Sequence, residues 1–85
     1  KKASRTATFI DEADQSLWDA LREKRRALAK EHSVPPYVIF HDATLKAMLE
    51  QRPSSMHELA HISGIGVRKL EAYGAEFLEV LLEAE

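Results

Sequence analysis

The chain has 85 residues, of which 45% are hydrophobic and 31% charged, with no cysteine and a formal net charge of −2 at pH 7. A chain of this length can form one small domain with a single modest core. The lack of cysteine excludes disulfides and thiolate metal ligands, and no apolar stretch approaches the roughly 18 residues that a membrane span needs. We therefore expect an intracellular, cytoplasmic protein. Because the chain starts with Lys1 instead of methionine, we also expect it to be a piece of a longer one.

The charged residues are unevenly distributed along the chain. Segment 22–30 has a local sum of +4, because five basic residues stand against the single acid Glu23: Arg22, Lys24, Arg25, Arg26 and Lys30. Segment 70–85 has a local sum of −5, because it has five acids and no lysine or arginine: Glu71, Glu76, Glu79, Glu83 and Glu85. Charge runs are usually solvated helix faces. Opposed patches in one small domain also suit docking of one patch on DNA and of the other on a basic neighbour.

The first ten residues show no hydrophobic periodicity, and we interpret 1–10 as a linker remnant in front of a helical domain over 11–85. From residue 14 to residue 31, apolar side chains recur at i, i+4, i+7 and i+11 spacing, which predicts one long amphipathic helix. Its apolar stripe comprises Leu17, Leu21 and Leu28, with Ala29 and the core anchor Trp18 beside them.

An apolar segment with two prolines follows this helix. Pro35 and Pro36 fix φ near about −65° and remove two N–H donors, which predicts a rigid connection instead of a strand. This connection can dock three apolar side chains into a core: Val38, Ile39 and Phe40. It turns Tyr37 toward the surface, and Tyr37 is therefore the first candidate for a functional residue.

Two further helices are predicted from their capping residues. Asp42 is expected to cap a second helix that ends before the next proline. Ser54 or Ser55 then caps a short third helix over 56–62, because Glu58 stands three residues after the second serine, as in a capping box.

Glycines mark the remaining boundaries. Gly64 and Gly66 bracket Ile65 in the pattern of a helix-hairpin-helix turn, with Gly64 in the left-handed conformation. A fourth helix over 67–73 is expected to end at Gly74. The last helix has an apolar face made of Phe77, Leu78, Leu81 and Leu82. These patterns predict an all-α fold, a compact and roughly orthogonal bundle of about five helices.

One sequence motif is identical to the signature of zinc proteases. His57, Glu58 and His61 form H-E-x-x-H, in which two histidines bind zinc and the glutamate acts as general base. The position of the third ligand in the longer form of this motif is Val67, which binds no metal. We therefore interpret these three side chains as a solvated face and predict no metal site. A phosphate-binding G-x-x-x-x-G-K-[ST] loop is also absent from the sequence, so we expect this chain not to be an enzyme.

Three stretches of the chain resemble one known family. The segment 34–45 reads Val-Pro-Pro-Tyr-Val-Ile-Phe-His-Asp-Ala-Thr-Leu. The upstream matches are Leu21-Arg22, Arg25 and Leu28-Ala29, and the downstream ones are Ile62-Ser63-Gly64-Ile65-Gly66-Val67-Arg68-Lys69-Leu70, Tyr73-Gly74 and Phe77. Over 17–82 the chain thus resembles the HRDC domain, the helicase and ribonuclease D C-terminal module, in the form found at the end of RecQ-type DNA helicases.

This resemblance implies an auxiliary domain of a RecQ-type ATP-dependent DNA helicase, which modulates engagement of single-stranded or branched DNA in repair and recombination. It implies that Tyr37 and nearby basic residues hold single-stranded DNA. The candidate phosphate contacts are Arg22, Arg25, Arg26, Lys46, Arg68 and Lys69. Gly64 and Gly66 could offer backbone N–H groups to a phosphate, or simply form a tight turn. Arg25 lies on nearly the same side of its helix as the leucines, so a structural ion pair is the alternative for it.

The resemblance places ATP and Mg²⁺ elsewhere in the parent protein, with no cofactor in this chain. It also implies a monomeric domain near the nucleoid that contacts DNA weakly and the helicase core of its own chain. The acidic last helix and the negative net charge predict weak binding to single strands.

Two alternatives remain open. The acidic helix could dock onto a basic surface of the helicase core or of another subunit, through Glu71, Glu76, Glu79 and Glu83. The chain could also be the accessory domain of a ribonuclease D-type exonuclease, with structured RNA as the substrate. The same fold would serve all three functions.

Overall fold

The computed structural model describes residues 12–84, which form helices and loops without a strand. The predicted all-α class is confirmed for these residues. The linker remnant expected over 1–10 and the acid Glu85 lie outside them. No helix within residues 12–84 is long and apolar enough to cross a membrane. The helical elements are α1 (Glu12–His32), α2 (Pro36–Ile39), α3 (Asp42–Gln51), α4 (Met56–Leu59), α5 (Val67–Lys69), the π-helical segment η1 (Leu70–Gly74) and α6 (Ala75–Glu83).

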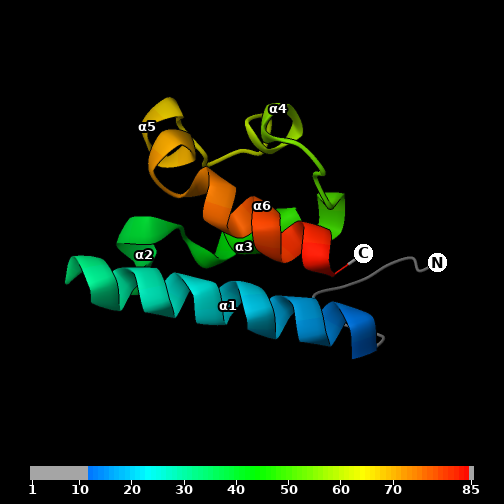
Figure 1. Ribbon diagram of the computed structural model, residues 1–85, viewed down its shortest axis with the longest axis horizontal. Coiled ribbons are helices and arrows are strands. Elements are labelled where there is room, and N and C mark those ends of the chain that lie inside the picture. The colour runs from blue at the N-terminus through cyan, green and yellow to red at the C-terminus, as the bar shows by residue number, and fades with distance from the viewer. Residues whose placement is uncertain (1–11, 85) are drawn as a thin grey trace.

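The long helix α1 forms one side of the molecule, and the other helices lie over a single face of it (Figure 1). Helices α2, α3 and α6 all contact α1. Helix α4 contacts η1 and α6 and does not lie against α1. Because α5, η1 and α6 follow one another without a break, the described residues form five separate helices. The number agrees with the prediction, but the predicted fourth and fifth helices are continuous, and the predicted connection is the helix α2.

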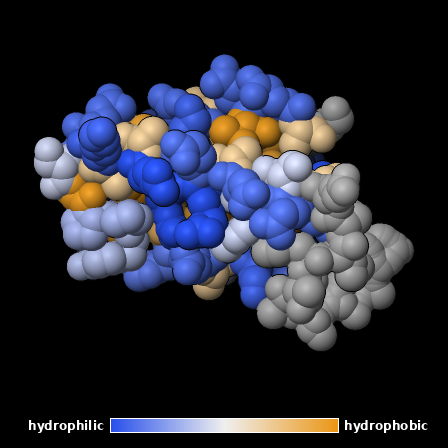
Figure 2. Space-filling model, turned by 90° about the horizontal axis from the view of Figure 1, so that it is seen from below, coloured by the Kyte–Doolittle hydropathy of each residue, from blue (hydrophilic) through white to orange (hydrophobic). Residues whose placement is uncertain are grey.

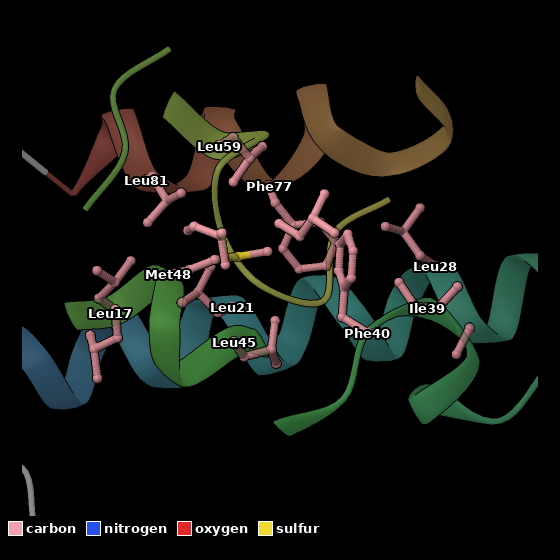
Figure 3. Close-up of a cluster of buried hydrophobic side chains, with 14 residues drawn as sticks. Leu17, Leu21, Leu28, Ile39, Phe40, Leu45, Met48, Leu59, Phe77 and Leu81 are labelled. Atoms are coloured by element: carbon pink, nitrogen blue, oxygen red, sulfur yellow. The ribbon is translucent and has the colours of Figure 1, made fainter. Parts of the chain in front are cut away.

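The hydrophobic core lies where α1, α3 and α6 meet. Figure 3 draws the buried side chains of the core between α1 and the helices that lie over it, and labels ten of them: Leu17, Leu21, Leu28, Ile39, Phe40, Leu45, Met48, Leu59, Phe77 and Leu81. Burial of each such side chain contributes about 1.5–3 kcal/mol. The predicted stripe of the first helix is confirmed, and Trp18 packs against the edge of the core while it stays partly exposed.

The segment after α1 is a helical turn instead of an irregular connection. Pro35 precedes α2 with an extended backbone, and Pro36 is its first helical residue, where a missing N–H removes no helical hydrogen bond. Ile39 and Phe40 are fully buried as predicted, but Val38 is 36% exposed. The prediction that Val38 docks into the core is therefore wrong, because one helical turn cannot direct three successive side chains to the same side.

Helix α3 starts differently from the prediction. His41, not Asp42, is the N-cap residue, and its side chain makes no capping hydrogen bond. Asp42 is the first helical residue, and its carboxylate forms an ion pair with Arg25 of α1. The prediction that Asp42 caps the helix is therefore wrong, because that carboxylate is used for a contact between helices. The helix ends at Gln51 as predicted, and Arg52 follows in the left-handed conformation.

The capping box predicted before α4 is present in modified form. The Ser55 hydroxyl accepts a hydrogen bond from the Glu58 N–H at 3.1 Å. The Glu58 carboxylate accepts one from the backbone N–H of Ser54 at 2.7 Å and one from its hydroxyl at 3.1 Å. In a standard box the carboxylate would bind the N–H of the capping serine itself. The helix ends at Leu59, earlier than the predicted end at Ile62.

Two glycines allow helices to approach closely. Gly64 has φ +95°, which confirms the predicted left-handed turn, and a Cβ there would collide with the Oγ1 of Thr44 on α3. Gly74 is helical, with φ −56° and ψ −44°, so the prediction that it ends a helix is wrong. A Cβ at Gly74 would lie 3.0 Å from both Leu70 Cδ1 and Met56 Cε. This glycine therefore serves the packing of α4 against η1 and does not interrupt the helix.

Candidate nucleic-acid interface

The turn of α2 presents an aromatic ring to solvent. Tyr37 is 59% exposed, although its neighbours Ile39 and Phe40 are fully buried. Its ring stacks against the imidazole of His41, with 5.9 Å between centroids and an interplanar angle of 25°. Because the two prolines fix the backbone before it and the two buried residues anchor the backbone after it, the Cα–Cβ bond of Tyr37 is directed toward solvent.

One open groove is lined by this ring, and a second groove lies next to the first. The first is lined by Arg25, Pro36, Tyr37, His41, Asp42 and Ala43. The second is lined by Asp19, Arg22, Glu23, Arg25, Arg26 and Pro36. Both share Arg25 and Pro36, so the grooves form one surface from the outer side of α1 to the start of α3. Figure 2 views the molecule from the side of α1, where hydrophilic residues predominate.

Arg25 has a structural function at the boundary between the grooves. Only 11% of its side chain is exposed, and Nη1 lies 2.7 Å from Asp42 Oδ1. The same nitrogen donates a hydrogen bond to the backbone carbonyl of Phe40 at 3.0 Å. The ion pair considered as the alternative for Arg25 is therefore present. A contact of Arg25 with a DNA phosphate stays a prediction. The phosphate would have to compete with the Asp42 carboxylate for the guanidinium.

The predicted basic run does not form one patch. Lys24 Nζ lies 3.3 Å from Glu76 Oε1 on α6, so the basic and acidic segments partly neutralise each other. Arg26 lies 4.0 Å from Glu23, and both side chains are mostly exposed, which makes this a weak surface pair. Arg22 is also exposed. Arg22 and Arg26 are one helical turn apart and line the second groove, which shares Arg25 and Pro36 with the groove of Tyr37. Their contacts with DNA phosphates stay predictions.

The other candidate cations line neither groove. Lys46 on α3 is half-buried, and Arg68 on α5 is exposed. Lys69 Nζ lies 6.0 Å from the centroid of the Phe40 ring, at the limit of a cation–π contact. Gly66 has open space around it, whereas the Gly64 turn is pressed against α3. Phosphate contacts by these residues and by the hairpin N–H groups stay predictions.

The glutamate of the H-E-x-x-H motif is part of a helix cap. Hydrogen bonds from the Ser54 backbone N–H, and secondly from its hydroxyl, lower the pKa of Glu58 below its ordinary value. His61 donates its Nδ1–H to the carbonyl of His57 at 2.9 Å, and the two rings lie edge to face. Among residues 12–84, no group of three His, Cys, Asp or Glu side chains could hold a metal ion.

Sequence reasoning did not identify His41 as a part of this surface. The sequence held no clear signal for this contact, because α2 ends at Ile39 and both Phe40 and His41 have an extended backbone. The four-residue spacing of Tyr37 and His41 is therefore not that of neighbours on a continuous helix.

The fold and this surface define a small all-α domain with an exposed aromatic ring beside basic side chains. The model of the HRDC domain family matches residues 14–81, and the chain belongs to that family. It is 39% identical to an ATP-dependent DNA helicase RecQ of Haemophilus influenzae over 70 residues, which cover 82% of this chain and 11% of that protein. It is 42% identical to the ATP-dependent DNA helicase UvrD2 of Mycobacterium tuberculosis over 77 residues, which cover 91% of this chain and 11% of that protein.

A solved structure shares the fold. The third HRDC domain of the RecQ protein of D. radiodurans superposes with a TM-score of 0.79 and is 38% identical, and the match covers 82% of this chain and 92% of that domain. The family assignment and the predicted all-helical HRDC-like fold are confirmed. The chain spans about a tenth of the length of the helicases that it matches.

Proposed function

We propose that this chain is an auxiliary domain of a RecQ-type ATP-dependent DNA helicase and tunes how the parent protein engages single-stranded or branched DNA in repair and recombination. The helicase relatives support this proposal, since the chain matches a short part of each. In this proposal the domain performs no catalysis, ATP and Mg²⁺ bind to the helicase core, and the protein acts at the nucleoid. Because the relatives are named DNA helicases, we favour a DNA substrate over the structured RNA of a ribonuclease D-type protein.

The observation that carries the proposal is the exposed ring of Tyr37 in a groove with Arg25, next to a second groove that Arg22 and Arg26 line. A base of a single strand can stack on such a ring, which contributes roughly 1–3 kcal/mol per base and requires no particular sequence. The two arginines lie in the adjoining groove, where they can neutralise phosphates of the same strand. Duplex DNA cannot use the ring in this way, because its bases are already stacked.

The charges of the domain imply weak binding. Lys24 and Arg25 are paired with Glu76 and Asp42 within the domain. The net charge is −2, and two or three remaining phosphate contacts give a slope of log K against log salt of about −1.5 to −2 for a single strand. We therefore expect a Kd in the micromolar range or weaker, which suits a domain that adjusts the binding of a larger protein.

Fluorescence anisotropy with a labelled oligonucleotide tests this function. Tyr37→Ala should weaken binding about fivefold or more, whereas Leu82→Ala, which truncates a partly exposed apolar side chain near the C-terminal end of α6, should leave it unchanged. Arg22→Gln with Arg26→Gln should weaken binding and flatten the salt dependence. Nanomolar affinity that is insensitive to salt, or equal effects of Tyr37→Ala and Leu82→Ala, would contradict the proposal.

A second candidate function is docking of α6 onto a basic surface of the helicase core or of another subunit. The supporting observation is that Glu79 and Glu83 are exposed on α6 while Phe77 and Leu81 of the same helix are buried. Such a helix keeps its fold while it offers carboxylates to a partner. Glu71 on η1 is also exposed, whereas Glu76 already has Lys24 as a partner.

A further inference from the structure

The contact between Tyr37 and His41 is not required by the local fold. His41 is the N-cap residue of α3, yet its side chain makes no capping hydrogen bond. Its backbone carbonyl accepts the first hydrogen bonds of the helix, from the N–H groups of Thr44 and Leu45. Serine, threonine, aspartate or asparagine would stabilise α3 better at this position. The imidazole therefore does something other than cap the helix.

The geometry of the two rings restricts what they can do together. Their centroids are 5.9 Å apart and their planes are inclined by only 25°. A flat base needs about 3.5 Å on each of its faces for stacking contact, so the space between the rings is too narrow for a base to enter. One face of Tyr37 is thus occupied by His41, and with 59% of the residue exposed the ring still offers surface to solvent.

We propose that His41 is a positioning residue for the binding of single strands: its imidazole backs one face of the Tyr37 ring and holds the opposite face toward an unpaired base. This inference rests on the proposed function, because it assigns a task to the same surface. An exposed aromatic side chain normally loses rotamer freedom when a ligand binds. A ring that already packs against a neighbour loses less rotamer freedom on binding. The smaller entropy cost makes the affinity for the ligand higher.

Substitutions of His41 separate this positioning from helix stability. His41→Ala and His41→Ser both remove the ring, and each should weaken binding of a labelled single strand about two- to tenfold, the factor of one aromatic pair. His41→Ser should do so while the melting temperature stays the same or rises, because serine can cap α3. His41→Phe keeps a ring without a charge and should retain the affinity within about twofold.

A double-mutant cycle tests whether His41 acts through Tyr37. In the Tyr37→Ala background at low salt, His41→Ala should have no further effect, since there is no ring left to position. Without DNA, the ring-proton resonances of His41 should shift in Tyr37→Leu, because the ring current of the tyrosine is lost. This NMR measurement decides the ring contact even if Tyr37→Ala removes all measurable binding.

The outcomes distinguish this inference from the function on which it rests. If Tyr37→Ala leaves binding unchanged, the stacking function itself is wrong. If Tyr37→Ala weakens binding but His41→Ala and His41→Ser do not, only the positioning by His41 is overturned. An equal loss from His41→Ala with and without Tyr37, or a failure of His41→Phe to restore affinity, would show that the imidazole contacts DNA directly and would also overturn it.

Discussion

Arg25 of α1 forms an ion pair with Asp42, the first residue of α3, with 2.7 Å between Nη1 and Oδ1. The same Nη1 atom donates to the carbonyl of Phe40 at 3.0 Å, two residues before the aspartate. The Arg25 side chain thus fixes the connection between α2 and α3, and Tyr37 lies on α2, directly before this connection. The grooves beside the ring depend on this attachment, because Arg25 lines both of them.

The two partners of this attachment should differ in their effect on stability. Arg25→Ala leaves the carbonyl of the buried Phe40 without its donor and should cost about 2 kcal/mol. Asp42→Asn removes a carboxylate that is 76% exposed and should cost less than about 1 kcal/mol. Urea denaturation of both variants measures the difference. Equal losses would mean that the ion pair, and not the hydrogen bond to the carbonyl, stabilises the connection.

The sequence predicted the core more accurately than the surface. The apolar stripe of α1 and the buried residues Phe77 and Leu81 of α6 follow directly from hydrophobic spacing, because buried positions of a helix must recur every three or four residues. Leu82, predicted on the same face of α6, is 44% exposed. One error falls where a polar side chain had two possible partners. Asp42 was predicted to cap α3, but an arginine on a distant helix was the better partner, and a sequence pattern does not show contacts between distant segments.

The predicted charge patches show the same limit. Lys24, Arg25 and Arg26 are consecutive, yet they face Glu76, Asp42 and Glu23 respectively. Successive helical residues point about 100° apart, so a basic run in the sequence is divided among several sides of the helix. The exposed Tyr37 could be predicted from the prolines, whereas its contact with His41 could not, because it depends on the one-turn helix between them.

The hairpin glycines should respond differently to the addition of a methyl group. Gly64→Ala places a Cβ against the hydroxyl of Thr44 at φ +95°, and we expect a loss of about 2 kcal/mol or more. Gly66→Ala meets no atom within 4 Å and should be close to neutral, which makes it the matched control. Thermal melts of the two variants check this. If they melt together, the turn is not pressed against α3 as described.

The cap of α4 should make stability depend on pH in the acid range. The pKa of Glu58 is lowered in the folded state by its hydrogen bonds to Ser54. Its stabilising effect is therefore fully present above the ordinary glutamate value of about 4.3. It is lost as the pH falls through the lowered folded value. Denaturation of wild type and Glu58→Gln from pH 7 to pH 3 should give a stability difference that shrinks toward low pH. A constant difference would contradict this linkage.

Metal should not affect folding, even though the sequence contains H-E-x-x-H. The Glu58 carboxylate is used in the cap, and His61 donates its Nδ1–H to the backbone carbonyl of His57. A structural metal would couple to folding, and chelation would then unfold part of the domain. Thermal melts with and without a chelator should coincide. A decrease of several degrees on chelation would restore the zinc interpretation, and loss of that decrease in His57→Gln would locate the site.

The acidic face of α6 distinguishes direct DNA contact from docking onto a partner. Glu79→Gln with Glu83→Gln removes two exposed carboxylates and should change the free energy of unfolding by no more than about 0.5 kcal/mol. If the domain acts by touching DNA, the double variant should raise single-strand affinity on the order of twofold at low salt, because fewer charges repel the phosphates. The same gain should appear in this chain and in the proposed parent helicase.

A matched variant shows whether position or only net charge matters. Glu31→Gln with Glu50→Gln removes the same charge from exposed positions on α1 and α3. If α6 docks onto a basic surface, only the α6 variant should change the preference of the full helicase for forked over single-stranded DNA, through contacts that this chain lacks by itself. Parallel gains by both double variants would indicate general repulsion. The absence of any change in either protein would identify the α6 carboxylates as ordinary solvated surface and end the docking alternative.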